Sequence, residues 1–227
     1  VKDYGNFSNL VLWLTFDEGG GTIAYDYSGN KNNGTLYNGT IVCSDPPTAG
    51  CPKWVEGKIE KALSFDGIND YINVSNSPTL NLTALTVCAW VNLSNSSYQV
   101  ILDKGERYQL RINLESKAEL MVGNGSTFTS VSSSTILQTN NWYFICGSAN
   151  GSEVKIYVNG TLENSIAQLS NIIIDSSPLT IATKNNLSYF FNGTLDEVKI
   201  YNRALSDEEI ASHFYPLKTK VFPATPI

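Results

Sequence analysis

Short segments of apolar or alternating residues recur along this chain at intervals of about ten residues, separated by clusters of Gly, Asn, Asp and Ser. This spacing predicts many short β-strands joined by turns, as in a sandwich or a barrel. Asn-Gly pairs strengthen the prediction, because both residues tolerate the positive φ angles of tight hairpin turns. The expected strands cover residues 10–16, 61–65, 71–74, 85–91, 99–103, 108–114, 119–122, 142–147, 154–158, 179–181 and 197–201.

One helix is predicted near the carboxyl end of the chain, over residues 206–214. Ser206 and Glu209 have the spacing of a capping box, in which each side chain bonds a backbone amide of the other residue. Prolines punctuate the stretch that follows, so it is expected to lack helix. We therefore divide the chain into an N-terminal extension (1–9), one domain (10–215) and a C-terminal tail (216–227).

The composition is typical of a protein that works outside the cytosol. The chain has 227 residues and a net charge of −6, with only 16% charged residues, and its polarity comes from 24 Asn, 24 Ser and 18 Thr. No basic stripe is present to neutralise phosphates, which argues against nucleic acid as a partner. The apolar runs are too short to span a bilayer. Since the chain starts at Val1, we interpret it as a mature product whose export signal was removed.

A series of sequence blocks resembles the LamG-like jelly roll of the concanavalin A-like superfamily. The resemblance implies an all-β fold, a two-sheet antiparallel jelly-roll sandwich with one short C-terminal helix. It implies no single function, because this fold hosts lectins, adhesive modules, glycosidases and scaffolds. The blocks are LWLTFDEG at 12–19, DYSGN at 26–30, ALSFDG at 62–67, DYI at 70–72, LTVCAWV at 85–91, NWY at 141–143, KIYVNG at 155–160, FNG at 191–193 and LDEVKIYNRALS at 195–206.

Four cysteines in a chain of extracellular composition predict two disulfides, with three possible pairings. Pentraxins, which are relatives in the same superfamily, join the two strands that correspond to those of Cys88 and Cys146. The resemblance therefore implies a Cys88–Cys146 bond, which leaves Cys43 to pair with Cys51 and close a Pro-rich loop.

Asn-X-Ser/Thr sequons are far more frequent than chance provides. All six Asn-Gly pairs are followed by Ser or Thr, a residue that turn chemistry does not require. We interpret them as acceptors of N-linked glycans. The twelve sequons begin at Asn6, Asn33, Asn38, Asn73, Asn81, Asn92, Asn95, Asn124, Asn150, Asn159, Asn186 and Asn192.

No catalytic set is recognised in the sequence, so we expect no enzyme. The acidic clusters are adjacent residues, which point to opposite faces of a strand or cap a helix, rather than a spaced pair facing one cleft. The remaining acids leave two alternatives open. Asp17, Asp66 and Asp196 could hold one structural calcium ion, or they could cap turns by accepting bonds from backbone amides.

Candidates for sugar binding are aromatic residues expected in loops, namely Trp54, Tyr189 and Phe190. Trp13, Trp90 and Trp142 lie in strand blocks and are expected in the core. Alternatively, the loop aromatic residues could simply cover the core.

Two functions are weighed for a protein that is secreted or displayed on the cell surface. The first is a non-enzymatic N-glycosylated subunit of an extracellular filament or surface layer, a homo-oligomer or homopolymer joined through its termini. It rests on a glycan-covered exterior, on the lack of an assembled active site and on the expectation that a neighbouring subunit holds the termini in order. The alternating segment 218–222 of the tail suits strand addition to a neighbouring sheet edge. The alternative is a carbohydrate-binding or adhesive module of a larger surface protein, with glycans as partners.

Overall fold

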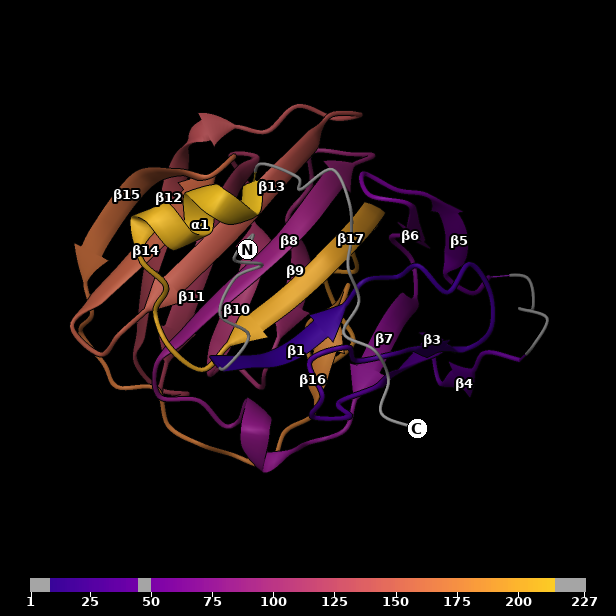
Figure 1. Ribbon diagram of the computed structural model, residues 1–227, viewed down its shortest axis with the longest axis horizontal. Helices are drawn as coiled ribbons and strands as arrows, with labels where there is room; N and C mark the ends of the chain where they lie inside the picture. Colours follow the sequence, from indigo (N-terminus) through magenta and orange to yellow (C-terminus); the bar gives the residue numbers. More distant parts are fainter. Residues whose placement is uncertain (1–8, 45–49, 215–227) are drawn as a thin grey trace, which may run out of the picture.

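The chain folds into two antiparallel sheets stacked face to face, with one helix on the outside (Figure 1). The structure is a computed structural model and describes residues 9–44 and 50–214. The predicted N-terminal extension (1–9) and C-terminal tail (216–227) lie almost entirely outside the described residues, so this division of the chain stays a prediction. Within the described part, the expected jelly-roll sandwich with a short C-terminal helix is confirmed.

Sheet A is ordered β15-β14-β13-β8-β17-β6-β5, and β1 pairs with β17 beside β6. The long strand β17 pairs with both β6 and β1 along the same edge. An irregularity after Asp196 divides it into two halves. Its first half pairs with β6 and its second half with β1. The strands of sheet A are β1 (Leu10–Leu14), β5 (Lys53–Glu56), β6 (Lys61–Asp66), β8 (Leu85–Leu93), β13 (Trp142–Ala149), β14 (Glu153–Val158), β15 (Thr161–Ala167) and β17 (Asn192–Tyr201).

Sheet B is ordered β12-β11-β10-β9-β16-β7-β3-β2, and β4 pairs with β3. β12 and β15, the last strands of the two sheets, lie at the same end of the sandwich (Figure 1). The strands of sheet B are β2 (Ile23–Ala24), β3 (Gly34–Asn38), β4 (Ile41–Val42), β7 (Asp70–Val74), β9 (Gln99–Asp103), β10 (Tyr108–Ile112), β11 (Lys117–Gly123), β12 (Phe128–Ile136) and β16 (Leu179–Ile181).

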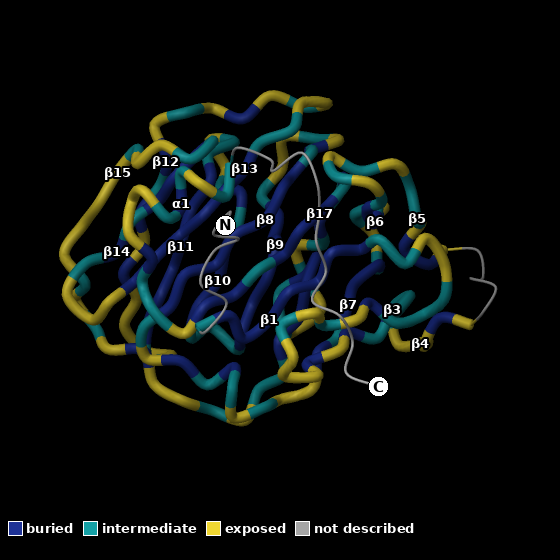
Figure 2. The backbone as a smooth tube through the Cα atoms, viewed as in Figure 1, coloured by how far each residue is buried: buried dark blue, intermediate teal, exposed yellow. Residues whose placement is uncertain are grey.

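The main core lies between the two sheets and follows from the alternation of side chains along each strand. On β10, for example, Leu110 and Ile112 are fully buried in the core, and on β11 Leu120 joins them. Figure 2 shows these strands as continuous buried stretches, with exposure concentrated in the turns at both ends. The large buried area supplies the dominant stabilising free energy of the domain.

A second apolar cluster lies on the outer side of sheet A, under helix α1 (Asp207–Phe214). Trp13 and Trp90 belong to this cluster, and Trp142 packs against it half-buried. Our expectation of core tryptophans was therefore incomplete: they cover the outside of sheet A rather than the space between the sheets. The helix begins as predicted, since Glu209 N donates to Ser206 Oγ at 3.2 Å and Ser206 N donates to Glu209 Oε2 at 2.8 Å.

Two disulfides are present, Cys88–Cys146 and Cys43–Cys51. These are the pairings that the family resemblance implies. Cys88 and Cys146 face one another in register on β8 and β13 and belong to the second cluster. Cys43 and Cys51 close the loop that connects β4 to β5.

Candidate functional site

Tyr189, one of the expected sugar-binding residues, lies beside a second aromatic residue, Tyr98. The ring centroids are 4.7 Å apart in an edge-to-face arrangement. Val100 N donates to Tyr189 O at 3.0 Å, so the loop after β16 runs along β9 and holds the pair together. Tyr189 is 53% exposed, whereas Tyr98 is half-buried. Burial raises the pKa of the Tyr98 hydroxyl, and the positive charge of Arg111 opposes this shift.

Next to the aromatic pair, the outer side of sheet B presents a row of polar side chains. Because Leu110 and Leu120 point into the core, their neighbours Arg111 and Glu119 point outward. These two residues are direct cross-strand partners, and Arg111 Nη2 donates to Glu119 Oε1 at 2.5 Å. Arg111 Nη1 also donates to Gln109 Oε1 at 2.9 Å. The guanidinium is therefore held in one plane against the sheet.

The guanidinium of Arg111 also lies against the ring of Tyr98, with Cζ 5.4 Å from the ring centroid. This is cation–π geometry. Arg111 Nε has no hydrogen-bond partner within the described chain, and the side chains of Arg111 and Glu119 keep 17% and 8% exposure. We call Tyr98, Tyr189, Arg111, Glu119 and Gln109 the sheet B platform. It is an aromatic pair beside an ion pair in which Arg111 is half-buried and Glu119 is buried, and Gln109 is fully buried.

A buried carboxylate fixes the base of this platform. Asp103 is fully buried, and its two carboxylate oxygens accept bonds from Gln109 Nε2 at 3.1 Å and from Asn185 N at 2.8 Å. Burial raises the pKa of Asp103, against the opposing effect of these hydrogen bonds. Lys184 Nζ and Glu106 Oε1, 2.5 Å apart, tie the covering loop to the turn after β9. Asp103 thus positions both Gln109 and the loop that carries Tyr189.

The other two aromatic candidates are placed differently. Trp54 lies on β5, at the opposite end of the other sheet. Its indole Nε1 donates to Gly21 O at 3.1 Å, and its ring packs half-buried against the core. Phe190 follows Tyr189 in the same loop and is half-buried. Trp54 is therefore not part of the platform.

The three aspartates expected as calcium ligands each bind backbone amides. Asp17 Oδ1 accepts from Lys61 N at 3.0 Å, and Asp196 Oδ2 accepts from Ile59 N at 2.8 Å. Asp66, at the far end of β6, accepts from Ile68 N at 2.8 Å. The described residues contain no group of three or more acidic, His or Cys side chains arranged for a metal. Asp66 thus caps its own turn, whereas Asp17 and Asp196 bind amides that are distant in the sequence. Calcium binding by these aspartates stays a prediction.

The sequon asparagines are spread over the turns and strands of both sheets. Eleven of the twelve lie in the described residues, and Asn6 lies outside them. Asn33, Asn150 and Asn186 are exposed, and the others are half-buried.

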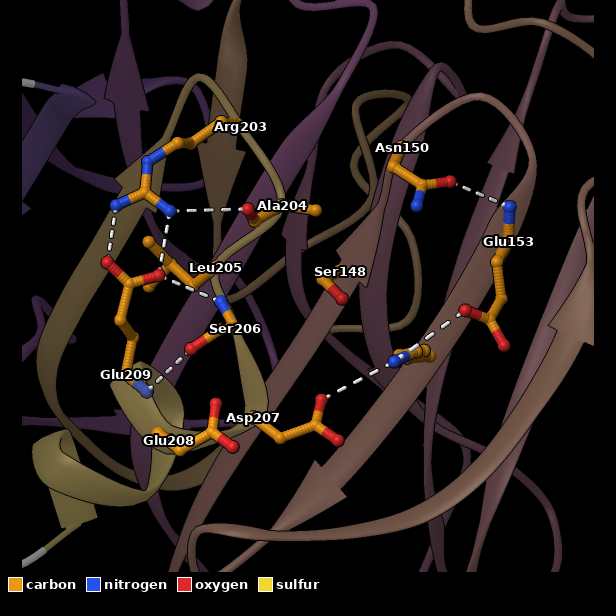
Figure 3. Close-up of a pocket in the computed structure, with 11 residues that line it drawn as sticks. Ser148, Asn150, Glu153, Arg203, Ala204, Leu205, Ser206, Asp207, Glu208 and Glu209 are labelled. Atoms are coloured by element: carbon orange, nitrogen blue, oxygen red, sulfur yellow. Dashed lines mark hydrogen bonds and ion pairs between the residues drawn. The ribbon is translucent and has the colours of Figure 1, made fainter.

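A pocket of about 470 Å³ opens beside the start of α1 and is lined by several acidic residues (Figure 3). Both of its basic residues form ion pairs with acids of the lining. Arg203 forms a two-pronged ion pair with Glu209, at 2.7 and 2.6 Å, and Lys155 lies 3.4 Å from Asp207. The Arg203 pair, assisted by the amide of Ser206, lowers the pKa of Glu209 to about 2. We assign these groups to helix capping.

A second pocket, of about 590 Å³, lies between β1, the 28–30 turn and the 3-10 helix η2 (Pro78–Leu80). Its lining is uncharged and lacks aromatic side chains. Asn30 Nδ2 donates to Leu10 O at 3.1 Å and thereby fastens the turn to β1. The pocket therefore offers hydrogen bonds but no stacking surface.

The sequence reasoning missed Tyr98, Arg111 and Glu119. Their alternation with core residues on β10 and β11 marks them only as outward-facing, which is also the pattern of an ordinary solvated face. The signal that distinguishes them is strand register. Arg111 lies opposite Glu119, and the segment before β9 places the Tyr98 ring against the Arg111 guanidinium. Strand register of this kind is not readable from one sequence.

The family model of the concanavalin A-like lectin/glucanases superfamily matches residues 66–211 of the chain. No curated protein sequence is similar enough to be matched with it. Domain 4 of AbnA, an extracellular arabinanase from Geobacillus stearothermophilus solved in complex with arabinotriose, has a similar structure. The TM-score is 0.73 at 19% identity, over 90% of this chain and 97% of that one.

Two toxin binding domains also share the fold. The binding domain of Paraclostridial Mosquitocidal Protein 1 has a TM-score of 0.71 at 17% identity, over 92% of this chain and 52% of that one. The ligand binding domain of botulinum neurotoxin serotype D, solved with N-acetylneuraminic acid, has a TM-score of 0.67 at 17% identity, over 92% of this chain and 51% of that one. This chain therefore spans about half the length of the toxin domains. Since the family model covers well over half of the chain, the protein belongs to the concanavalin A-like lectin/glucanases superfamily.

Proposed function

We propose that the protein is a non-catalytic carbohydrate-binding module that takes a saccharide on the sheet B platform. One observation carries the proposal: the Arg111–Glu119 pair lies in plane against the sheet directly beside the Tyr98 ring. Sugars present hydroxyl edges and apolar C–H faces. A fixed guanidinium–carboxylate pair can exchange hydrogen bonds with the hydroxyls, and an aromatic ring can cover the C–H face.

Further support comes from the proteins that share the fold. The arabinanase domain was solved with arabinotriose and the botulinum domain with N-acetylneuraminic acid. These ligands belong to those proteins, but they favour a saccharide over the other small molecules that a polar face could take. The two disulfides favour a secreted or cell-surface location, since such bonds persist in oxidising compartments. None of the helices described is long and apolar enough to cross a membrane.

This proposal reverses the order of the two functions weighed from the sequence. The filament hypothesis depends on residues 216–227, which lie outside the described residues. Assembly through the termini stays a prediction, and electron microscopy of the full chain tests it.

A glycan array followed by titration calorimetry tests the binding proposal. We expect Tyr98→Ala and Tyr189→Ala each to weaken the affinity for the selected saccharide by about tenfold, or about 1.4 kcal/mol. Arg111→Lys should also weaken binding, because an ammonium group cannot form the planar pair with Glu119.

Tyr25→Ala is the matched control. Tyr25 is similarly exposed, at 51%, but follows β2, five strands away from β10. The Tyr25→Ala variant should bind the saccharide with the affinity of the wild type. The Trp54→Ala variant should do the same, provided that it folds. Wild-type affinity of both Tyr98→Ala and Tyr189→Ala, or no retained saccharide on the array, would overturn the proposal.

A further inference from the structure

The asparagine side chains outside sequons often use the amide nitrogen to hold the fold together. In six of them Nδ2 donates a hydrogen bond. Asn32 Nδ2 donates to Val11 O at 2.8 Å, and Asn185 Nδ2 donates to Pro178 O at 2.8 Å. These six donors are Asn30, Asn32, Asn113, Asn141, Asn164 and Asn185.

The asparagines inside sequons behave in the opposite way. Apart from Asn38, ten of them lie in the described residues, and none of these ten donates a hydrogen bond from Nδ2 to any described residue. Five use the oxygen instead, accepting from a backbone N–H. The acceptors, with their distances, are Asn33 (2.9 Å), Asn95 (3.2 Å), Asn124 (3.0 and 2.9 Å), Asn150 (2.9 and 2.8 Å) and Asn159 (3.0 Å).

These contacts fix which way each amide group faces. A backbone N–H can only donate, so the atom that it approaches must be the side-chain oxygen and not the nitrogen. Nδ2, on the other arm of the amide, is left without a structural task at all five positions. N-glycosylation attaches the sugar to this nitrogen.

Turn chemistry alone does not explain the contrast. Asn113 Oδ1 accepts from Glu115 N at 2.9 Å and from Lys117 N at 3.1 Å, so it binds amides that closely follow it in the chain, as Asn95, Asn124 and Asn150 do. Asn33 and Asn159 instead accept from the more distant amides of Asp26 and Phe144. Yet Asn113 Nδ2 also donates a hydrogen bond, to Ser132 Oγ at 3.2 Å, and Asn113 does not begin a sequon. A turn asparagine in this fold can therefore use its nitrogen, and the five sequon asparagines do not.

We propose that Asn33, Asn95, Asn124, Asn150 and Asn159 are N-glycan acceptors whose modification the folded domain tolerates without rearrangement. The donor is an activated glycan carried on a lipid phosphate or pyrophosphate. Asn Nδ2 forms a bond to the anomeric carbon, the bond from that carbon to the phosphate oxygen breaks, and the oxygen leaves with the electron pair. One Nδ2 proton passes to a base of the transferring enzyme. The side-chain oxygen keeps its hydrogen bonds to backbone amides throughout.

Secretion of the full chain from an N-glycosylating eukaryotic host, with an unstructured acceptor peptide appended, provides the test. Peptide mass spectrometry should find glycans at the five asparagines, and the glycosylated protein should have the same Tm as, or a higher Tm than, protein secreted with host glycosylation blocked. Glycosylation of the appended peptide with all five asparagines bare would overturn the proposal, because the host is then shown to be competent.

Glu115→Thr supplies the matched control, since it creates a sequon at Asn113 while retaining the backbone amide of residue 115. A glycan there competes with the Asn113–Ser132 hydrogen bond, so the glycosylated variant should have a lower Tm than the same variant secreted with host glycosylation blocked. If the wild type loses as much Tm on glycosylation as Glu115→Thr does, the five positions are not tolerant acceptors.

Discussion

Thr86 is a fully buried hydroxyl whose two hydrogen bonds fasten the chain segment leading to α1. Thr86 Oγ1 donates to Arg203 O at 2.9 Å and accepts from Leu205 N at 2.8 Å. A buried polar group that loses its partner retains the cost of leaving water without compensation.

Thr86→Val should therefore lower the free energy of unfolding by about 1–3 kcal/mol, although the side chain keeps its shape. Thr86→Ser, which keeps the hydroxyl, should lose clearly less. Urea unfolding followed by circular dichroism measures both, and equal losses in the two variants would contradict the role of the hydroxyl.

Asp70 makes the free energy of unfolding decrease as the pH rises, which is opposite to the usual effect of an aspartate. Its side chain is 2% exposed, and Oδ1 has no hydrogen-bond partner within the described residues. Burial, together with the neighbouring Asp66, raises the pKa of Asp70 to about 7. In the unfolded chain the carboxyl group of Asp70 ionises near pH 4. The stabilising contribution of protonated Asp70 is thus complete below about pH 4 and is lost as the pH rises through 7.

Asp70→Asn removes this ionisation. The Tm of the variant relative to wild type should rise between pH 5 and pH 8, with about 2–4 °C for each 1 kcal/mol. Scanning fluorimetry across this range measures the difference. Parallel Tm curves for the two proteins would show that Asp70 does not titrate there.

At the level of elements, Glu163 on β15 joins the edges of the two sheets. Its carboxylate accepts from the backbone amides of Ser134 and Thr135 on β12, at 2.9 and 2.8 Å, and also from both hydroxyls. Burial raises the pKa of Glu163, but these hydrogen bonds outweigh it and hold the pKa below its usual value.

Glu163→Ala should lower the free energy of unfolding by about 1–3 kcal/mol at neutral pH, since the two β12 amides lose a charged acceptor. The loss should shrink as the pH falls through the lowered pKa, where wild-type Glu163 is itself protonated. Chemical unfolding at pH 7 and pH 3 provides the comparison. A loss that is the same at both values would contradict the charge-assisted contact.

Strands β12 and β15 show which parts of the fold could not be predicted from the sequence. Most apolar strands were expected nearly where they lie, and Gln99–Asp103 and Leu179–Ile181 agree with their predicted bounds. The short strands β2, β3, β4 and β5 were not predicted. β12 was missed because it is mostly Ser and Thr, and only Thr129, Val131 and Ser133 face inward. β15 was missed because nearly every position of this edge strand is exposed, so it has no inward-facing pattern. Pairing, not local hydrophobicity, makes both segments strands.

On the scale of the whole molecule, the two disulfides constrain very different lengths of chain. Cys88 and Cys146 are separated by 58 residues, Cys43 and Cys51 by 8. Chain-entropy arguments assign about 4 kcal/mol to the longer loop and about 2.5 kcal/mol to the shorter one.

Replacing both Cys88 and Cys146 by Ala should therefore destabilise the domain more than replacing Cys43 and Cys51. Urea unfolding of the two double variants tests the order. A larger loss for the Cys43–Cys51 variant would show that local strain or packing, rather than loop length, sets the contribution.

The pairing of β1 with β17 has a mechanical consequence. Leu10 faces Tyr201, and Asn202 N donates to Asn9 O at 2.9 Å, so the two described ends of this ladder lie together. Tension applied between Asn9 and Tyr201 would break the hydrogen bonds between β1 and β17 one after another, starting at this end, and would not distribute the force over all of them at once. The domain would thus yield at low force by peeling β1 away. The Cys88–Cys146 bond would then limit the extension, because the residues between these cysteines cannot be pulled out.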